Sequence, residues 1–251
     1  MATQAQIDGG LRGRDEGYDF EETVKLNKDG CFPSDMLDIW GERKTTSKTD
    51  VVTEDHNYSI KNSQKSTQIQ VCSVDRFSRL FNVNGDLKDQ FDQFFGNHGY
   101  FKDQRLFKEH CEKIWGIDTK NLSQEKEIRR NRVLGSNLTN CQSMVDWFQE
   151  NIRSVLEFAF KTSFNNPANT ETIASRVLWT KNKDCYDTRC EFDIDPLIDK
   201  IVEKAIVRVR PNGSVIEIGP VTLQMKGSGK SASAYHNMQF NASLKDIEKW
   251  I

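Results

Sequence analysis

The sequence lacks the features of a membrane protein, of a zinc module and of a basic protein that coats nucleic acid. None of its apolar runs approaches the ~18–20 residues that a membrane-spanning helix needs. Its six cysteines form no C-x-x-C motif, and the four histidines do not cluster with them. The 35 Lys and Arg residues are balanced by 37 Asp and Glu residues. A basic surface for a polyanion must therefore be local.

The N-terminal residues show no secretory pattern. Residues 1–8 contain neither a basic stretch nor an apolar core. We therefore expect a cytoplasmic protein whose cysteines are reduced and mostly buried. The length of 251 residues allows one large domain or two small ones, and 15 Phe and 5 Trp can seed a real core.

Hydrophobic patterns predict one α/β domain, residues 1–251, with a helical insertion. Residues 1–75 contain a predicted N-terminal helix and a strand–turn–strand unit. Residues 75–160 place aromatic residues at helical intervals and are predicted to be mostly helical. Residues 175–245 turn to β character, with β-branched runs separated by turn residues.

The strand–turn–strand at residues 49–61 is the most informative stretch. If a four-residue loop closes this hairpin, Thr53 pairs with Tyr58. Asp50 then faces Lys61 directly across the two strands. The pattern thus predicts a carboxylate and an ammonium side by side on one face of a hairpin.

The predicted Asp50–Lys61 pair has a functional and a structural interpretation. Hydrolysis of a phosphodiester needs a carboxylate that holds a divalent cation and a lysine that positions or deprotonates water. A second carboxylate is normally needed for the metal, and Glu21 on the preceding predicted helix is the obvious donor, with Glu22 as the alternative. The structural interpretation is a surface ion pair worth ~0.2–1 kcal/mol.

Segments that keep their order along the chain carry a resemblance to a known family. One segment looks like the PD-(D/E)xK nuclease signature: Ser47-Lys48-Thr49-Asp50 … Tyr58-Ser59-Ile60-Lys61. HinP- and Msp-type restriction endonucleases have a C-terminal segment similar to Val221-Thr222-Leu223-Gln224-Met225-Lys226-Gly227 … Asn237-Met238-Gln239-Phe240. The HinP type also has a helix similar to Asp146-Trp147-Phe148-Gln149-Glu150-Asn151. The resemblance implies a PD-(D/E)xK core, in which a mixed central sheet is flanked by helices.

The resemblance also implies roles for individual residues. Asp50 would be the metal-binding carboxylate and Lys61 the catalytic lysine, and Ile60 would offer its backbone carbonyl to the same Mg²⁺. Glu21 would be the glutamate on the preceding helix. Ser59 occupies the position that is usually acidic or an amide. Because a hydroxyl is a poor substitute for a carboxylate ligand of Mg²⁺, a nearby carboxylate must compensate.

Double-stranded DNA is the partner that the resemblance implies, and the residue chemistry agrees. Residues 207–236 contain four basic residues and one acidic residue. Glutamine can pair with adenine and lysine with guanine in the major groove. A solvated turn is the structural alternative for the glycine-rich part of this stretch. The candidate DNA-binding residues are Gln64, Lys65, Gln68, Gln224, Lys226, Ser228, Lys230 and Gln239.

The activity that the resemblance implies is that of a Type II restriction endonuclease. It would hydrolyse DNA with Mg²⁺ at a short, 4-bp palindromic site, as a monomer or a homodimer. A cognate DNA methyltransferase would protect the host sites. Two alternatives stay open: a repair or nicking nuclease of the same fold, and a catalytically silent, sequence-specific DNA-binding protein in which Ser59 marks a decayed site.

A second constellation competes for the role of active site. Asp193 or Asp195 followed by Gln224 and Lys226 also gives a carboxylate and a Gln-x-Lys motif. Residues 196–205 between them predict a helix, so this set fits a direct hairpin poorly. We therefore expect the chemistry at the earlier hairpin.

Overall fold

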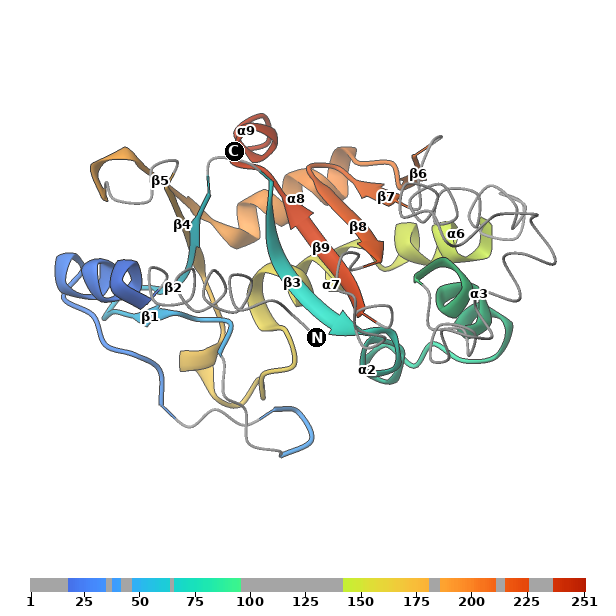
Figure 1. Ribbon diagram of the computed structural model, residues 1–251, viewed down its shortest axis with the longest axis horizontal. Helices are drawn as coiled ribbons and strands as arrows, with labels where there is room; N and C mark the ends of the chain where they lie inside the picture. The colour runs from blue at the N-terminus through green and yellow to red at the C-terminus, as the bar shows by residue number, and fades with distance from the viewer. Residues whose placement is uncertain are drawn as a thin grey trace, which may run out of the picture. The chain divides into compact units, whose positions relative to one another are not determined.

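The protein has a mixed α/β fold. A computed structural model describes residues 18–34, 38–41, 47–63, 66–95, 142–180, 186–210, 215–225 and 237–251 (Figure 1). The backbone divides into two compact units, one formed by residues 1–70, 152–205 and 241–251, the other by residues 71–151 and 206–240. None of the described helices is both long and apolar enough to cross a membrane.

The first unit contains a four-stranded mixed sheet in the order β1-β2-β4-β5 (Figure 1). These strands are β1 (Val51–Val52), β2 (Asn57–Asn62), β4 (Arg176–Thr180) and β5 (Arg189–Asp193). The β1–β2 and β4–β5 pairs are antiparallel, whereas β2 and β4 run parallel. Of the strand–turn–strand expected at 49–61, the second strand is therefore present as β2, but the first is reduced to two residues within the described part.

Both faces of this sheet are covered by apolar side chains. Residues 18–27 form a helix. Its Phe20 and Val24 pack on the face that carries Val51, Tyr58, Ile60 and Leu178. The opposite face carries the buried Val177, Trp179 and Phe192. Packing on both sides fixes the backbone of β2, which carries Ser59, Ile60 and Lys61.

The remaining elements of the first unit are helical and short. They are α7 (Ile152–Glu157), the π-helix η3 (Phe158–Thr162), the 3₁₀ turns η4 (Thr170–Thr172) and η5 (Tyr186–Thr188), α8 (Ile194–Lys204) and α9 (Leu244–Ile247). The helix expected at 196–205 is confirmed as α8. The π-helix ends at Ser163, a non-glycine residue with a φ of 51°.

The second unit contains most of a five-stranded sheet in the order β3-β9-β8-β7-β6. These strands are β3 (Thr67–Ser73), β9 (Asn237–Ala242), β8 (Val221–Met225), β7 (Val215–Ile218) and β6 (Arg208–Val209). The described helices of this unit are α2 (Val74–Leu80), α3 (Gly85–Phe95) and α6 (Gln142–Glu150).

Aromatic rings form the core of the second unit. The rings of Phe91 and Phe148 stack with their centroids 5.1 Å apart, and Phe77 lies 6.1 Å from Phe240. Trp147 meets Phe91 edge to face at 5.4 Å. These rings come from α2, α3, α6 and β9, as the helical spacing of aromatic residues predicts for the helices. Each such pair adds about 0.5–1.5 kcal/mol beyond the burial of its area.

Two sequence-based expectations about the sheets are wrong. The described strands form two sheets rather than one central sheet, because β3 joins β9 and not β2. The strand β5 was not expected at all. Its sequence Arg189-Cys190-Glu191-Phe192-Asp193 is charged on one face, and that face forms ion pairs instead of an apolar layer.

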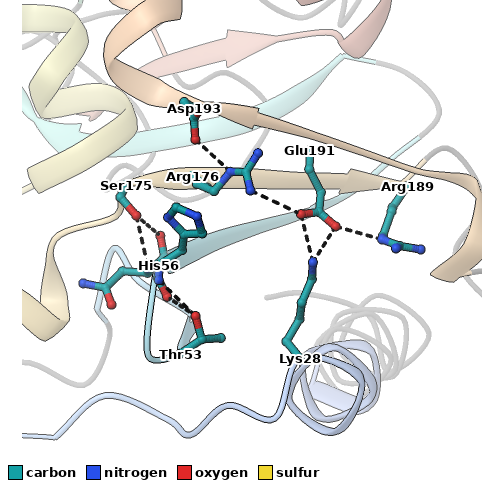
Figure 2. A network of polar contacts seen from close by, with 9 residues as sticks. Lys28, Thr53, His56, Ser175, Arg176, Arg189, Glu191 and Asp193 are labelled. Atoms are coloured by element: carbon teal, nitrogen blue, oxygen red, sulfur yellow. Dashed lines mark hydrogen bonds and ion pairs between the residues drawn. The ribbon is translucent and has the colours of Figure 1, made fainter.

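Glu191 is the centre of a polar network that joins the end of the N-terminal helix to the sheet (Figure 2). Its carboxylate lies 2.8 Å from Lys28 Nζ and from Arg189 Nε, and 3.8 Å from an Arg176 nitrogen. Burial alone raises the pKa of Glu191, but the hydrogen bonds and charges of Lys28 and Arg189 outweigh it and lower that pKa. The folded protein therefore favours the ionised carboxylate.

Replacing Glu191 tests this network. Glu191→Gln should lower the free energy of unfolding at pH 7 by about 2 kcal/mol, because three cations lose their charged partner. A carboxylate with a lowered pKa stabilises the fold above its unfolded pKa of 4.5, and this stabilisation is lost as the pH falls. The difference between the two chains in urea unfolding should therefore shrink below pH ~4.5. Glu54→Gln, at an exposed position, is the control, and an equal difference at both pH values would contradict the prediction.

Candidate active site

The hairpin that carries the candidate site is closed by a tighter turn than expected. Val51 pairs with Tyr58, so the expected pairing of Thr53 with Tyr58 is wrong by two residues. The Thr53 hydroxyl donates to the His56 carbonyl at 2.9 Å and accepts from the His56 N–H at 3.0 Å (Figure 2). These two bonds, and a backbone bond from Thr53 N–H to the same carbonyl, close the turn before Asn57.

A shift of two residues leaves every side chain on its expected face, because the side-chain period of a strand is two. The β1–β2 ladder ends at the Val51–Tyr58 pair, and in the same register Asp50 would face Ser59 instead of Lys61. Lys61 becomes a diagonal neighbour, and its Nζ lies 3.9 Å from Asp50 Oδ2. The two side chains therefore still meet, although not as a direct cross-strand pair.

Asp50 is bound to β2 through both its backbone and its side chain. Its N–H donates to the Tyr58 carbonyl at 2.8 Å. Its Oδ2 accepts a short bond, 2.6 Å, from the backbone N–H of Ile60. Since β1 contains only Val51 and Val52, the carboxylate takes the place that a strand backbone would have beside Ile60.

The Lys61 ammonium folds back along its own strand. It donates to the Ser59 hydroxyl at 2.9 Å and to the Ile60 carbonyl at 2.8 Å. Ser59 is buried, with 1% of its surface exposed, and the Lys61 side chain is 17% exposed. The ammonium is thus held at one point by a hydroxyl, a carbonyl and the nearby Asp50 carboxylate.

Glu21 belongs to the same cluster. Its pKa is raised to about 7, mainly by burial and also by the charge of Asp50, while the charge of Lys61 partly opposes the rise. Glu22 instead forms an ion pair of 2.6 Å with Lys25, one turn along the helix. Of the two candidate glutamates, Glu21 is therefore the one that interacts with Asp50 and Lys61.

Asp50 lies in an environment that disfavours its charge. Burial raises its pKa, and the charge of Lys61, the N–H of Ile60, the charge of Lys48 and the Ser59 hydroxyl only partly offset this effect. Lys48 was given no role by the sequence analysis, although it is buried and acts on Asp50. Its signal in the sequence is the spacing of two residues from Asp50, which aligns both side chains along an extended segment.

These groups provide hard oxygen donors. The Glu21 and Asp50 carboxylates and the Ile60 carbonyl are the oxygen types that Mg²⁺ prefers, and Mg²⁺ keeps several water ligands of its own. Within the described ranges no group of three or more His, Cys, Asp or Glu side chains could hold a metal ion. Any cation here would therefore depend on two carboxylates and the backbone.

The candidate DNA-binding residues are only partly described. Gln68 is exposed at the beginning of β3, and Gln224 and Gln239 are half-buried on β8 and β9. Both arginines of the expected basic stretch pair with Glu217: Arg208 at 2.7 Å and Arg210 at 2.8 Å. Outside the described residues lie Gln64, Lys65, Lys226, Ser228 and Lys230.

The carboxylates of the rival constellation are engaged in ion pairs. Asp193 lies 2.8 Å from Arg176 Nε, and Asp195 lies 2.8 Å from Lys161 Nζ. Both contacts are within the first unit. Each of these carboxylates is therefore neutralised by a neighbouring cation.

The chain was compared with protein families, curated proteins and solved structures. No protein-family model matches the chain, and no curated protein matches it. The chain is similar to a solved structure described as the restriction endonuclease MspI in complex with its cognate DNA, with 13% sequence identity and a TM-score of 0.48. The match covers 78% of this chain and 64% of that chain, so it spans less than two thirds of the solved protein.

The electrostatics of the cluster can be measured without any substrate. In metal-free buffer, NMR titration of the Glu21 side-chain carbon should give a pKa of about 7. Asp50→Asn should lower this pKa, but not to the ordinary value of 4.5, because burial is the larger cause. Glu22→Gln is the matched control and should leave it unchanged. A Glu21 pKa near 4.5 in the unmodified chain would contradict the described burial.

Proposed function

We propose that this chain is a Mg²⁺-dependent nuclease that hydrolyses phosphodiester bonds in double-stranded DNA, as a Type II restriction endonuclease with a short, 4-bp palindromic site. The observation that carries the proposal is the contact of the Asp50 carboxylate with Ile60 N–H and Lys61, next to a half-buried Glu21 whose pKa responds to both charges. Two carboxylates, a backbone carbonyl and a lysine are the groups that metal-assisted phosphodiester hydrolysis needs.

The donor set fits a divalent cation. Burial and then the charge of Asp50 raise the pKa of Glu21, and a bound cation would offset the repulsion between the two carboxylates. Glu21 also supplies the carboxylate that Ser59 does not. We assign Glu21, Asp50 and the Ile60 carbonyl as the groups that hold Mg²⁺, which when bound polarises the phosphate and lowers the pKa of a water molecule.

The chain's own residues supply the remaining chemistry. Lys61, 3.9 Å from Asp50, is placed to orient the attacking water and to stabilise the negative charge that develops on the phosphate. Ser59 is buried beneath the ammonium and accepts a bond of 2.9 Å from it. We therefore assign Ser59 the task of orienting Lys61, in place of a direct metal ligand.

Recognition of DNA is assigned to polar side chains at two places in the sequence. Gln64, Lys65 and Gln68 follow β2, and the second set, Gln224, Lys226, Ser228, Lys230 and Gln239, lies on and between β8 and β9. Glutamine and lysine carry the donors and acceptors that read base edges in the major groove. Arg208 and Arg210 are paired with Glu217, so we assign them no DNA contact.

The proposal includes a cellular context. A restriction endonuclease acts in the cytoplasm, next to a cognate DNA methyltransferase that protects the host sites. A monomer or a homodimer would each suit a palindromic site, and the two differ in how the second strand is cut.

A digest of unmethylated DNA tests the proposal. With Mg²⁺, the chain should give discrete fragments that share a terminal sequence, and EDTA should abolish them. Lys61→Met should lower the rate by about 10²–10³-fold, because it removes the cation that stabilises the developing charge. Lys25→Met, on the N-terminal helix, is the matched control and should cut normally.

Other outcomes separate the alternatives. Nicked circles would indicate a nicking or repair nuclease of the same fold. Intact DNA with Mg²⁺ and with Mn²⁺, together with retained sequence-specific binding, would indicate a catalytically silent binding protein. Lys226→Ala should weaken recognition by ~1–3 kcal/mol without removing cleavage if it reads a base edge. Loss of cleavage in Lys226→Ala, but not in Lys61→Met, would move the chemistry to the rival constellation.

A further inference from the structure

The segment that carries Asp50 is not held by a regular strand. The β1 ladder begins only at Val51, one residue after Asp50. Ser47, Lys48 and Thr49 precede it without a ladder, yet Lys48 and Thr49 are 6% and 1% exposed. A buried, irregular segment needs side-chain bonds to fix its position.

Lys48 supplies the strongest of these bonds. Its ammonium donates to the Ile69 carbonyl of β3 at 2.6 Å and lies 3.5 Å from the Gln70 side-chain oxygen. The Ser47 hydroxyl makes a longer contact, 3.5 Å, with the Thr172 carbonyl. A charged donor makes a hydrogen bond roughly twice as strong as a neutral one, so Lys48 dominates the attachment.

The acceptor side of this bond is itself held in place. Ile69 is 5% exposed within β3. The Gln70 side chain donates to the Ser163 hydroxyl at 2.9 Å. Ser163 ends the π-helix η3 in a left-handed backbone conformation, which the surrounding contacts must maintain. Lys48 thus ties the Asp50 segment to a fixed point of the same unit.

We propose that Lys48 is a positioning residue of the nuclease site: by binding the Ile69 carbonyl, it holds Asp50 where its carboxylate meets Ile60 N–H and Lys61. The inference rests on the proposed function, because Asp50 acts there as a metal ligand. Groups that orient a metal ligand typically change metal affinity about 10–100-fold when they are removed. Lys48 acts through Asp50 and touches no reacting atom.

The sign of the effect on metal affinity separates positioning from charge alone. Removing a cation that acts on the Asp50 carboxylate should tighten the binding of a divalent cation if charge is its only contribution. Removing an anchor should weaken it, because Asp50 is then held only by its own bonds to β2. A purely structural role should lower the melting temperature and leave the affinity unchanged.

Calorimetric titration with Mn²⁺, without DNA, is the decisive measurement. Lys48→Met should bind Mn²⁺ about 10-fold more weakly than the unmodified chain. It should also cleave with a lower kcat at saturating Mn²⁺ and an unchanged KM for DNA. Lys48→Arg keeps a charged donor and should recover most of the affinity. Lys161→Met, which removes a lysine paired with Asp195, is the matched control and should bind Mn²⁺ normally.

Unchanged or tighter Mn²⁺ binding by a folded Lys48→Met chain would overturn the inference and leave the proposed function standing. If Lys48→Met does not fold, Lys48→Gln, which keeps a neutral donor, is measured against the same criteria. An unmodified chain that neither binds Mn²⁺ nor cleaves DNA would overturn the proposed function and this inference together.

Discussion

The candidate site depends on one hydrogen bond, the 2.6 Å contact from the Ile60 N–H to the Asp50 carboxylate. β1 is too short to pair with this part of β2, so a side chain satisfies a backbone donor that a neighbouring strand would otherwise satisfy. The same bond places a carboxylate beside the Ile60 carbonyl and the Lys61 ammonium. A longer β1 would occupy this edge with backbone and leave no room for the site.

The charges of the site are held together at a cost to stability. Burial disfavours the ionised forms of Asp50 and Glu21, and the charge of Asp50 makes Glu21 harder still to ionise. The apolar packing of Phe20 and Val24 against Val51, Tyr58 and Ile60 supplies the free energy that keeps the N-terminal helix, and with it Glu21, beside the hairpin. The Glu191 network, by contrast, pairs each acidic side chain with cations and stabilises the fold.

The predicted and observed hairpins differ in pairing register by two residues. Because two is the side-chain period of a strand, Asp50 and Lys61 still lie on the same face. A shift of one residue would have placed Asp50 and Lys61 on opposite faces of the hairpin. The error arose at the turn, where the side chain of Thr53 makes two bonds to His56 that composition alone does not predict. The missed strand β5 has a similar origin, since its charged face finds partners that are distant in the sequence, such as Lys28.

The sequence by itself determined what local chemistry controls: which residues alternate on β2, the helix α8 and the aromatic helices of the second unit. It also contained the residue types of the site, because a carboxylate and a lysine at hairpin spacing must lie within reach of each other. Only the tertiary structure showed which glutamate, Glu21 or Glu22, interacts with Asp50. It also decided that β2 pairs with β4, that β3 belongs to a second sheet, and that Lys48 binds the Ile69 carbonyl. The physical reason is distance along the chain. Contacts such as that between Lys61 and Trp179 depend on packing of whole elements, which no short window of sequence specifies.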